Sequence, residues 1–317
     1  MQIYKDVLKA HERIASHVRK TPVDRALSLE ENFESEVYLK LENVQVTGSF
    51  KVRGAMNRAL CIPPQEQAAG IVAASTGNHG AGVAFAARTL GIPGVVYVPE
   101  TASPEKVAAI SRLGAEVRYH GDDCVITELE ARRYANSTGS VYISPYNDEQ
   151  VVAGQGTIGH ELLQQIDELD TVFVAMGGGG LISGIAGYLA HASPKTRVIA
   201  CSPANSCVMH QSLQAGQLLD LPSEPTLSDS TAGGVEAGSV TFGLCQSYVS
   251  DSITVTEEEI IGATRRIITE QHLLVEGAAG VAVAGYLTNQ ERHRGQRVGI
   301  ILCGANIPLA KLKTILG

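Results

Sequence analysis

The chain has 317 residues and a formal net charge of −8; 44% of its residues are hydrophobic and 18% are charged. This composition is typical of a globular protein with one large or two medium domains. The acidic balance argues against partners such as nucleic acid or an anionic membrane, and no apolar run approaches the roughly 20 residues of a membrane span.

The N-terminal stretch MQIYKDVLKAHERI predicts an amphipathic helix. Charges occur throughout it, so it does not resemble a signal peptide. Six cysteines are scattered along the chain, and none forms a CxxC pair. We therefore expect no disulfide framework and a cytoplasmic location.

Short apolar runs alternate with helical patterns between residues 70 and 145. The expected strands are 70–75, 94–99, 115–121 and 141–145, and the expected helices are 81–91, 103–114 and 123–137. Ser-Pro starts the second helix and a glycine ends it, which are ordinary start and stop signals. Such a series of β-α-β units predicts a parallel sheet covered by helices.

A second series of the same kind begins near residue 150. Its expected helices are 160–166, 181–193, 257–272 and 277–287, and its expected strands are 171–176, 197–203 and 297–306, the last of which closes the sheet. Residues 214–238 are rich in Pro, Ser, Gly and acids, which predicts an irregular loop. We place a large lobe at 1–60 and 148–317 and a small, mobile lobe at 65–147. A cleft between two such lobes is the usual place for a small-molecule site.

Four consecutive glycines, 177–180, follow one expected strand and lead directly into a helix. Bare N–H groups at a helix N-terminus bind phosphate, and the helix dipole favours its charge. No Lys-Ser/Thr pair follows the glycines, and no acid ends the next strand to hold a ribose, so neither a P-loop nor a dinucleotide site is indicated. The pattern predicts a cradle for a ligand with a single phosphate; the alternative is a tight turn without a ligand.

Two further loops carry polar groups at the ends of expected strands. The stretch STGNHG, 75–80, opens a helix and offers donors for a carboxylate or phosphate, or else serves only as a helix N-cap. The stretch CGAN, 303–306, ends the last strand, where ligands of open α/β sheets bind. Cys303 is therefore either a ligand contact or a buried structural thiol.

A single lysine, Lys51, lies between Phe50 and Val52 in the stretch GSFKVRGA, 48–55. Taken alone, it is either a lysine that extends its ammonium group to solvent or a lysine that takes part in the chemistry of a site. Together with a phosphate cradle and a carboxylate-binding loop, it suggests pyridoxal 5′-phosphate, whose aldehyde a lysine binds as a Schiff base. Apolar neighbours would lower the pKa of the lysine from its ordinary value of about 10.4.

The stretches GSFKVRGA, STGNHG, VAGQGT, GGGGL and CGAN, in this order, resemble the fold-type II pyridoxal-phosphate enzymes of the serine/threonine dehydratase and serine racemase family. The resemblance covers essentially the whole chain. It implies an α/β fold of two open, mostly parallel, doubly wound sheets, similar to the tryptophan synthase β subunit, with the cofactor in the cleft between the lobes. It also implies a homodimer.

The resemblance implies cofactor contacts for individual residues. Lys51 would hold pyridoxal 5′-phosphate and later move the Cα proton of the substrate, and Phe50 would pack beside the ring. Asn78 would bind the phenolic oxygen, and Cys303 would face the pyridine nitrogen. The phosphate would be bound by the backbone N–H groups of Gly177, Gly178, Gly179, Gly180 and Leu181.

The resemblance implies substrate contacts as well. The residues that would bind the substrate carboxylate are Ser75, Thr76, Asn78 and His79. Gly154 and Gln155 of VAGQGT would line the same cleft, and Gly234 would lie near the leaving group.

Cys303 bears on the type of reaction, because a thiol does not protonate the pyridine nitrogen as an aspartate would. The ring is then a weaker electron sink, which disfavours a long-lived carbanion and favours loss of a β-hydroxyl coupled to proton removal. We therefore expect an ammonia-lyase that converts a small β-hydroxy amino acid, such as L-threonine or L-serine, to a 2-oxo acid and ammonia.

Two positions depart from the pattern of racemising relatives. Thr76 occupies the place of their catalytic serine on the opposite face of the cofactor; its hydroxyl is a candidate for that work, but its methyl group crowds the site. Ser202 and Val208 stand where the divalent-metal site of those relatives has acids, so we expect no metal there. The alternatives are a serine or aspartate racemase, a dehydratase for 3-hydroxyaspartate, phenylserine or a hydroxyectoine-derived amino acid, and a non-catalytic binding protein.

Overall fold

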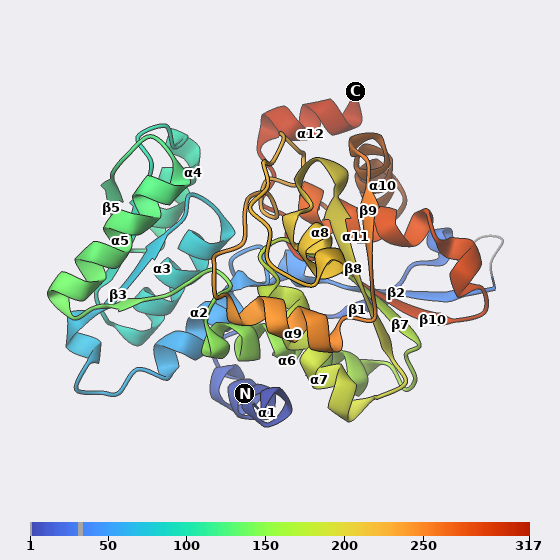
Figure 1. The fold of residues 1–317 in the computed structure, drawn as a ribbon, viewed down its shortest axis with the longest axis horizontal. Helices are drawn as coiled ribbons and strands as arrows, with labels where there is room; N and C mark the ends of the chain where they lie inside the picture. Colours follow the sequence, from blue (N-terminus) through green and yellow to red (C-terminus); the bar gives the residue numbers. More distant parts are fainter. Residues whose placement is uncertain (1, 31–33) are drawn as a thin grey trace.

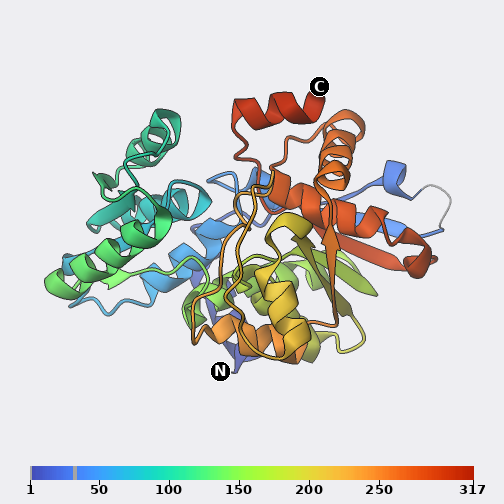
Figure 2. The same ribbon diagram turned by 45° about the horizontal axis from the view of Figure 1, so that its top comes forward.

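The computed structural model describes residues 2–30 and 34–317. Two separate sheets, each with its own helices, form two lobes that lie side by side (Figures 1 and 2). Within the described residues, both sheets are mostly parallel, which confirms the predicted α/β fold. No helix in the described ranges combines the length and the apolar character needed to cross a bilayer.

The larger sheet has six strands in the described part of the chain. From edge to edge these are β1 (Val23–Arg25), β2 (Glu36–Lys40), β10 (Arg297–Ile301), β7 (Thr171–Ala175), β8 (Arg197–Pro203) and β9 (Asp251–Val255). Only the pairing of β1 with β2 is antiparallel. The last strand was expected to close the sheet, but β10 lies in its centre, where it pairs with β2 and β7.

The smaller sheet has four parallel strands within the described residues. In order across the sheet they are β5 (Glu116–Tyr119), β4 (Gly94–Val98), β3 (Ile71–Ala74) and β6 (Val141–Tyr142). All four were expected from the sequence, and each is shorter than its prediction by one or more residues.

Helices surround both sheets. Those next to the smaller sheet are α3 (Asn78–Leu90), α4 (Pro104–Arg112) and α5 (Cys124–Thr138). Those next to the larger sheet are α1 (Ile3–Ile14), α6 (Glu149–Gln165), α7 (Gly180–Ala192), α8 (Val208–Ala215), α9 (Val240–Tyr248), α10 (Glu257–Glu270), α11 (Gly277–Leu287) and α12 (Leu309–Leu316). Short 3-10 turns occur at Leu27–Leu29, Glu42–Val44, Gln67–Ala69, Ala204–Ser206 and Gln290–His293.

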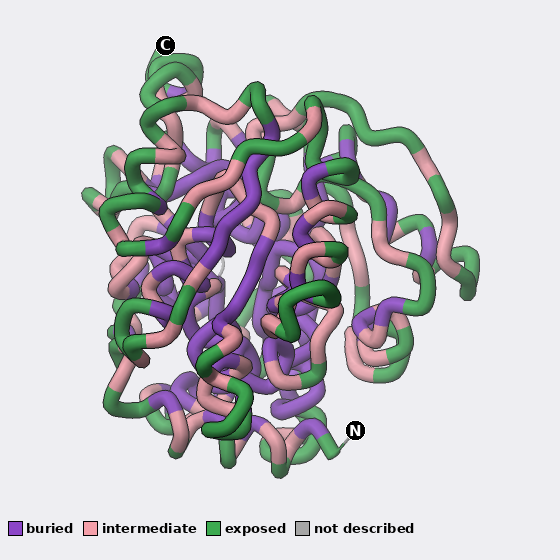
Figure 3. The backbone as a smooth tube through the Cα atoms, turned by 90° about the vertical axis from the view of Figure 1, so that its left-hand side faces the viewer, coloured by how far each residue is buried: buried purple, intermediate pink, exposed green. Residues whose placement is uncertain are grey.

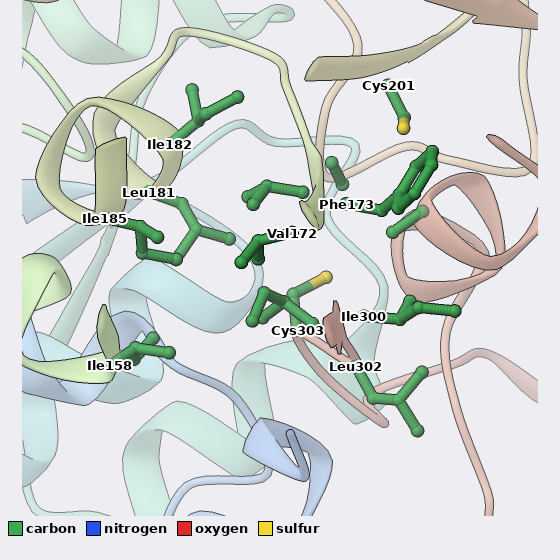
Figure 4. Close-up of a cluster of buried hydrophobic side chains, with 14 of the residues drawn as sticks. Ile158, Val172, Phe173, Leu181, Ile182, Ile185, Cys201, Ile300, Leu302 and Cys303 are labelled. Atoms are coloured by element: carbon green, nitrogen blue, oxygen red, sulfur yellow. The ribbon is translucent and has the colours of Figure 1, made fainter. Parts of the chain in front are cut away.

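The main core lies between the larger sheet and its helices. Helix α11 packs on β7, β8 and β10, while α7 packs on β7 and β8 together with α6 and α1. Figure 4 shows Ile182 and Ile185 of α7 in this core, with Phe173 and Ile300 of the central strands. Interior strands such as β4 and β7 are mostly buried, whereas edge strands such as β5 and β9 are not. Figure 3 shows the buried segments inside the molecule and more exposed segments around them.

Sequence signals explain where several helices begin and end. The side chains of Asp123 and Asp148 accept N–H groups at the start of α5 and α6, and Thr256 and Glu259 form a capping box at the start of α10. Helix α3 ends at Gly91, which adopts a left-handed conformation with φ of 66°. These signals act within one turn of helix, so they are visible in the sequence.

Helix α2 (Lys51–Leu60) lies where the two lobes meet, because it packs against both α3 and α6. A buried network of ion pairs holds this helix in place. Arg53 Nε is 2.8 Å from a Glu42 oxygen, and Arg53 Nη1 is 2.7 Å from a Glu161 oxygen. Lys40 Nζ is 2.6 Å from the other Glu161 oxygen, and all four side chains are almost inaccessible to water. The network fixes the helix that begins at Lys51.

Candidate active site

Lys51 is the first residue of α2 and lies beside the end of the last strand. The N–H of Phe50 donates to the carbonyl of Cys303 at 3.0 Å, and Ser49 forms an isolated β-bridge with Gly304. The stretches GSFK and CGAN are about 250 residues apart in the sequence, and β10 brings them together because it lies next to β2.

The ammonium group of Lys51 is partly buried in a weakly polar setting. Its Nζ donates to the carbonyl of Pro145 at 2.8 Å and lies 5.2 Å from the centre of the Phe50 ring. Loss of water around the group lowers the pKa of Lys51 to about 8, against a smaller opposing effect of Cys303 and Glu276. A free amine is therefore accessible near neutral pH, as a lysine that bonds to an aldehyde requires.

The four glycines form the turn from β7 into α7. Gly179 has a φ of 85°, a left-handed conformation that favours glycine, and α7 has no side-chain cap at its N-terminus. A Cβ atom on Gly177 would lie 2.6 Å from the carbonyl oxygen of Thr231, and one on Gly178 would lie 2.6 Å from the Tyr146 ring. The bare backbone N–H groups of this turn are available to an anion.

The stretch STGNHG runs from the end of β3 into α3. The hydroxyl of Ser75 accepts the N–H of Gly77 at 3.1 Å, and the first turn of α3 leaves backbone N–H groups without partners inside the helix. Ser75 and Thr76 are partly exposed, whereas Asn78 and His79 are buried.

The ring of His79 is buried and neutral. Its Nε2 donates to the carbonyl of Ile143 at 2.7 Å, and its buried Nδ1 has no hydrogen-bond partner. Burial, followed by the nearby Lys51 charge, lowers the pKa of His79 to about 3. Because Nδ1 then carries no hydrogen, the ring cannot donate to a carboxylate, which leaves the backbone N–H of His79 as the donor.

Cys303 follows β10 and is 2% exposed. Burial raises the pKa of its thiol well above the ordinary value, so the group is a neutral thiol at physiological pH. After burial, the nearby charge of Glu276 raises the pKa of this thiol further, whereas that of Lys51 lowers it.

The VAGQGT stretch lies in α6 and contacts α2. A Cβ atom on Gly154 would lie 2.6 Å from the Cα of Gly54, and Gln155 Oε1 accepts the N–H of Gly54 at 3.2 Å. These contacts hold α2, the helix that begins at Lys51, against α6. A contact of Gly154 or Gln155 with substrate stays a prediction.

The segment 228–239, which we call the strap, passes over the glycine turn. Its Thr231 lies against Gly177, and the N–H of Glu236 donates to the hydroxyl of Tyr146 at 2.9 Å. Gly234 itself is exposed, with open space around it. Its predicted place near the leaving group stays a prediction.

The positions compared with the racemase metal site hold neutral side chains. Ser202 is buried and donates to the carbonyl of Met176 at 3.0 Å, and Val208 is the first residue of α8. Among residues 2–30 and 34–317, no group of three or more His, Cys, Asp and Glu side chains is arranged to hold a metal ion.

Glu276 is a residue of the site that the sequence analysis missed. It precedes α11, is 4% exposed, and accepts hydrogen bonds from Asn78 and Ser230. The only signal in the sequence is an acid directly before an apolar helix, which is common at helix starts.

The residues present fit pyridoxal 5′-phosphate. The glycine turn offers a cradle that a Cβ atom would fill, and Lys51 has a lowered pKa. Ser49 Oγ and His79 Nδ1 are buried polar atoms without partners in the same region. A phosphate-binding turn and an amine of low pKa are the two groups that this cofactor requires.

Comparison with known proteins also indicates a pyridoxal-phosphate enzyme. The family model for pyridoxal-phosphate dependent enzymes matches residues 14–304. An L-threonine ammonia-lyase of Thermotoga maritima is 37% identical over 311 residues, which are 98% of this chain and 77% of that protein. A β-hydroxyaspartate dehydratase of Paracoccus denitrificans is 35% identical over 309 residues, 98% of each chain. The structure of maize serine racemase has a TM-score of 0.93 and 31% identity, and covers 99% of this chain and 96% of that one.

The chain therefore belongs to the pyridoxal-phosphate dependent enzyme family. Its cofactor is pyridoxal 5′-phosphate, and it is an ammonia-lyase of the threonine/serine dehydratase type that acts by β-elimination on a hydroxy amino acid. This confirms the fold, the cofactor and the reaction class predicted from the sequence.

Proposed function

We propose that the enzyme eliminates the β-hydroxyl of a small β-hydroxy amino acid, such as L-threonine or L-serine, as water. Hydrolysis of the resulting enamine then takes up one water and releases a 2-oxo acid and ammonia. The observation that carries the proposal is the Lys51 amine, whose pKa is lowered to about 8 beside the phosphate cradle and the neutral Cys303 thiol. Similarity to the L-threonine ammonia-lyase of Thermotoga maritima supports this choice of substrate.

The cofactor, when bound, supplies an electron sink that weakens the Cα–H bond of the substrate. Lys51 holds the cofactor and then accepts the Cα proton at Nζ; a pKa near 8 allows that atom to accept and return a proton close to neutral pH. Cys303 presents a neutral thiol to the pyridine nitrogen, which favours loss of the β-hydroxyl over a long-lived carbanion. The Thr76 hydroxyl is the proposed second catalytic group.

The proposed contacts follow from the two helix N-termini of the site. The backbone N–H groups of Gly177–Leu181 bind the phosphate, and Phe50 packs beside the ring. Ser75, Thr76 and the first-turn N–H groups at Asn78 and His79 bind the substrate carboxylate.

We extend the proposal to the organisation of the protein. Residues 65–147 form a lobe that moves relative to 1–60 and 148–317, and two copies of the chain form a homodimer. The cysteines of the described residues are all free, which supports a reducing cytoplasm as the location.

The test is an assay of 2-oxo acid and ammonia with L-threonine, L-serine, 3-hydroxyaspartate and phenylserine. Lys51→Ala should abolish the visible absorbance of the bound cofactor and reduce kcat by roughly a thousand-fold or more, since it removes the cofactor anchor and the base. Lys195→Ala, at an exposed lysine, is the matched control and should leave both unchanged. A wild-type protein that stays colourless after reconstitution with the cofactor would refute the proposal.

Racemisation of serine or aspartate is the second candidate, which similarity to maize serine racemase supports. Thr76 argues against it, because its methyl group occupies the face where racemising relatives use a serine. Chiral analysis of serine after incubation separates the two activities. D-serine formed as fast as pyruvate would favour the racemase, and Thr76→Ser should raise its share of the products.

A further inference from the structure

Glu276 is a buried carboxylate to which the proposed mechanism gives no task. It is 4% exposed, and the side chains that donate hydrogen bonds to it, Asn78 and Ser230, are neutral. Its own N–H donates to the carbonyl of Gly304 at 2.9 Å, and a Cβ atom on Gly304 would lie 2.9 Å from its carboxyl carbon. The carboxylate therefore lies flat against the backbone that follows Cys303.

Two distant segments supply side-chain hydrogen-bond donors to this carboxylate, and the backbone of Asn306 supplies a further one. Asn78 Nδ2 lies 3.0 Å from one oxygen and 2.9 Å from the other, and Ser230 Oγ lies 2.9 Å from the first. Asn78 begins α3 in the smaller lobe, and Ser230 belongs to the strap. A buried carboxylate without a cation depends on such donors, since an unpartnered charge in the interior is costly.

These contacts fix the orientation of the Asn78 carboxamide. Its Oδ1 accepts a hydrogen bond from Asn306 Nδ2 at 2.6 Å, while its Nδ2 faces Glu276. Seen from Nδ2, the two oxygens of the carboxylate lie closer together in direction than the two N–H bonds of the carboxamide. A single N–H therefore donates to both oxygens. The second N–H of Asn78 is thereby directed away from Glu276 and remains free.

We propose that Glu276 is a positioning residue, which orients the free N–H of Asn78 toward the phenolic oxygen of the cofactor and fastens the strap through Ser230. This inference rests on the proposed function, because it takes the cofactor contact of Asn78 from there. Glu276 does not itself react; it acts through Asn78. Its negative charge also favours the protonated form of Lys51.

The experiment measures the absorbance spectrum and the dissociation constant of pyridoxal 5′-phosphate for the full-length holoenzyme. Glu276→Gln keeps the shape but places an NH2 group or a neutral oxygen opposite Asn78, so the carboxamide loses its fixed orientation. We expect a shifted visible band, at least a ten-fold weaker cofactor affinity, and a kcat that falls more than KM rises. Glu257→Gln is the matched control, because Glu257 accepts the N–H of Leu227, the residue before the strap, and lies outside the site; its spectrum should be that of wild type.

A double-mutant cycle separates positioning from general support of the fold. If Glu276 acts through Asn78, then Glu276→Gln causes no further change of the spectrum in an Asn78→Ala background. Fully additive spectral changes, or a wild-type spectrum and affinity in folded Glu276→Gln, would overturn the inference.

Asn306→Ala covers the case in which Glu276→Gln does not fold. Asn306 is exposed and holds the other end of the same carboxamide, so its removal should shift the visible band in the same direction with an unchanged melting temperature. An unshifted band in Asn306→Ala would contradict the proposal. The visible spectrum and the dissociation constant concern cofactor binding and not turnover, so these two readouts stay informative even if the elimination assay fails.

Discussion

At the scale of single residues, the site depends on the protonation states of three neighbouring groups. Lys51 has a lowered pKa, His79 is a neutral ring, and Cys303 is a neutral thiol, in each case chiefly because burial removes water. Glu276 is the nearby anion, and burial raises its pKa as well. The cleft therefore holds few charges, which suits an amine that must be uncharged to react.

The first prediction concerns the pH at which Lys51 becomes a nucleophile. In cofactor-free protein, labelling of Lys51 by trinitrobenzenesulfonate should reach half its maximal rate near pH 8, because the free amine is populated above the pKa of about 8. Residue-specific mass spectrometry measures this. Since Glu276 raises the pKa of Lys51, Glu276→Gln should move the midpoint to lower pH. Labelling that increases only toward pH about 10.4, where free lysine titrates, would contradict the prediction.

Most of the candidate site could be predicted at this scale, because its motifs are local. The chemistry of each motif can be inferred from a few neighbouring residues, as in GSFK, STGNHG, GGGG and CGAN. Glu276 was missed because its partners, Asn78 and Ser230, are 198 and 46 residues away in the chain. The tautomer of His79 could not be predicted, because it depends on the carbonyl of Ile143, 64 residues away in the chain.

At the scale of elements, the crossing of α6 and α7 shows why a glycine-rich stretch is helical. The sequence predicted a helix only around 160–166, whereas α6 begins at Glu149. Gly156 and Gly184 face each other at the crossing, and a Cβ atom on Gly156 would lie 2.8 Å from the carbonyl oxygen of Gly184. Tertiary packing therefore outweighs the low helix propensity of these glycines.

The second prediction tests this close approach. A Cβ atom on Gly184 would lie 2.3 Å from the carbonyl oxygen of Val152, so Gly184→Ala must separate the two helices. We expect a loss of about 1–3 kcal/mol in the free energy of unfolding, measured by urea denaturation.

Gly262→Ala in α10 is the matched control for that variant. An added Cβ atom at Gly262 meets open space in the middle of a helix, so the free energy of unfolding should rise by about 0.5–1 kcal/mol. Equal effects of the two alanines would show that the α6–α7 contact does not require glycine.

Elements at the edge of the larger sheet escaped prediction for a different reason. Strand β9 pairs with β8 alone, and only its last residue, Val255, is buried. Strand β1 has three residues. An edge strand with exposed polar side chains lacks the apolar run that marks buried parallel strands such as β7 and β8.

At the scale of the whole molecule, the strap connects the two lobes across the site. Arg132 Nη2 of α5 lies 3.0 Å from Glu236, and Lys106 Nζ of α4 lies 3.7 Å from Asp229. Asp229 is also 3.3 Å from Lys311 of α12. Because these side chains are partly exposed, each pair contributes at most about 1 kcal/mol. The contacts restrain the strap and add little to global stability.

The third prediction concerns this restraint. Arg132→Met or Glu236→Gln should raise KM for the amino-acid substrate and speed hydrogen exchange across 228–239, while the free energy of unfolding changes by less than about 1 kcal/mol. In the double variant the rise in hydrogen exchange should be smaller than the sum of the two single effects, because both substitutions remove the Arg132–Glu236 ion pair. Each also removes a contact of its own, since Arg132 pairs with Glu128 and Glu236 accepts a hydrogen bond from Asn147. Unchanged exchange in the strap would show that the ion pair does not hold it.

The sequence alone determined the alternation of strands and helices, the glycine turn, the lysine stretch and the acidic net charge. Each of these depends on residues near one another in the chain or on composition. Only the tertiary structure decided that β10 lies between β2 and β7, which places Cys303 beside Phe50, and that Glu276 meets Asn78 and Ser230. Strand order and such distant contacts result from the packing of all elements together, and no local pattern of residues specifies them.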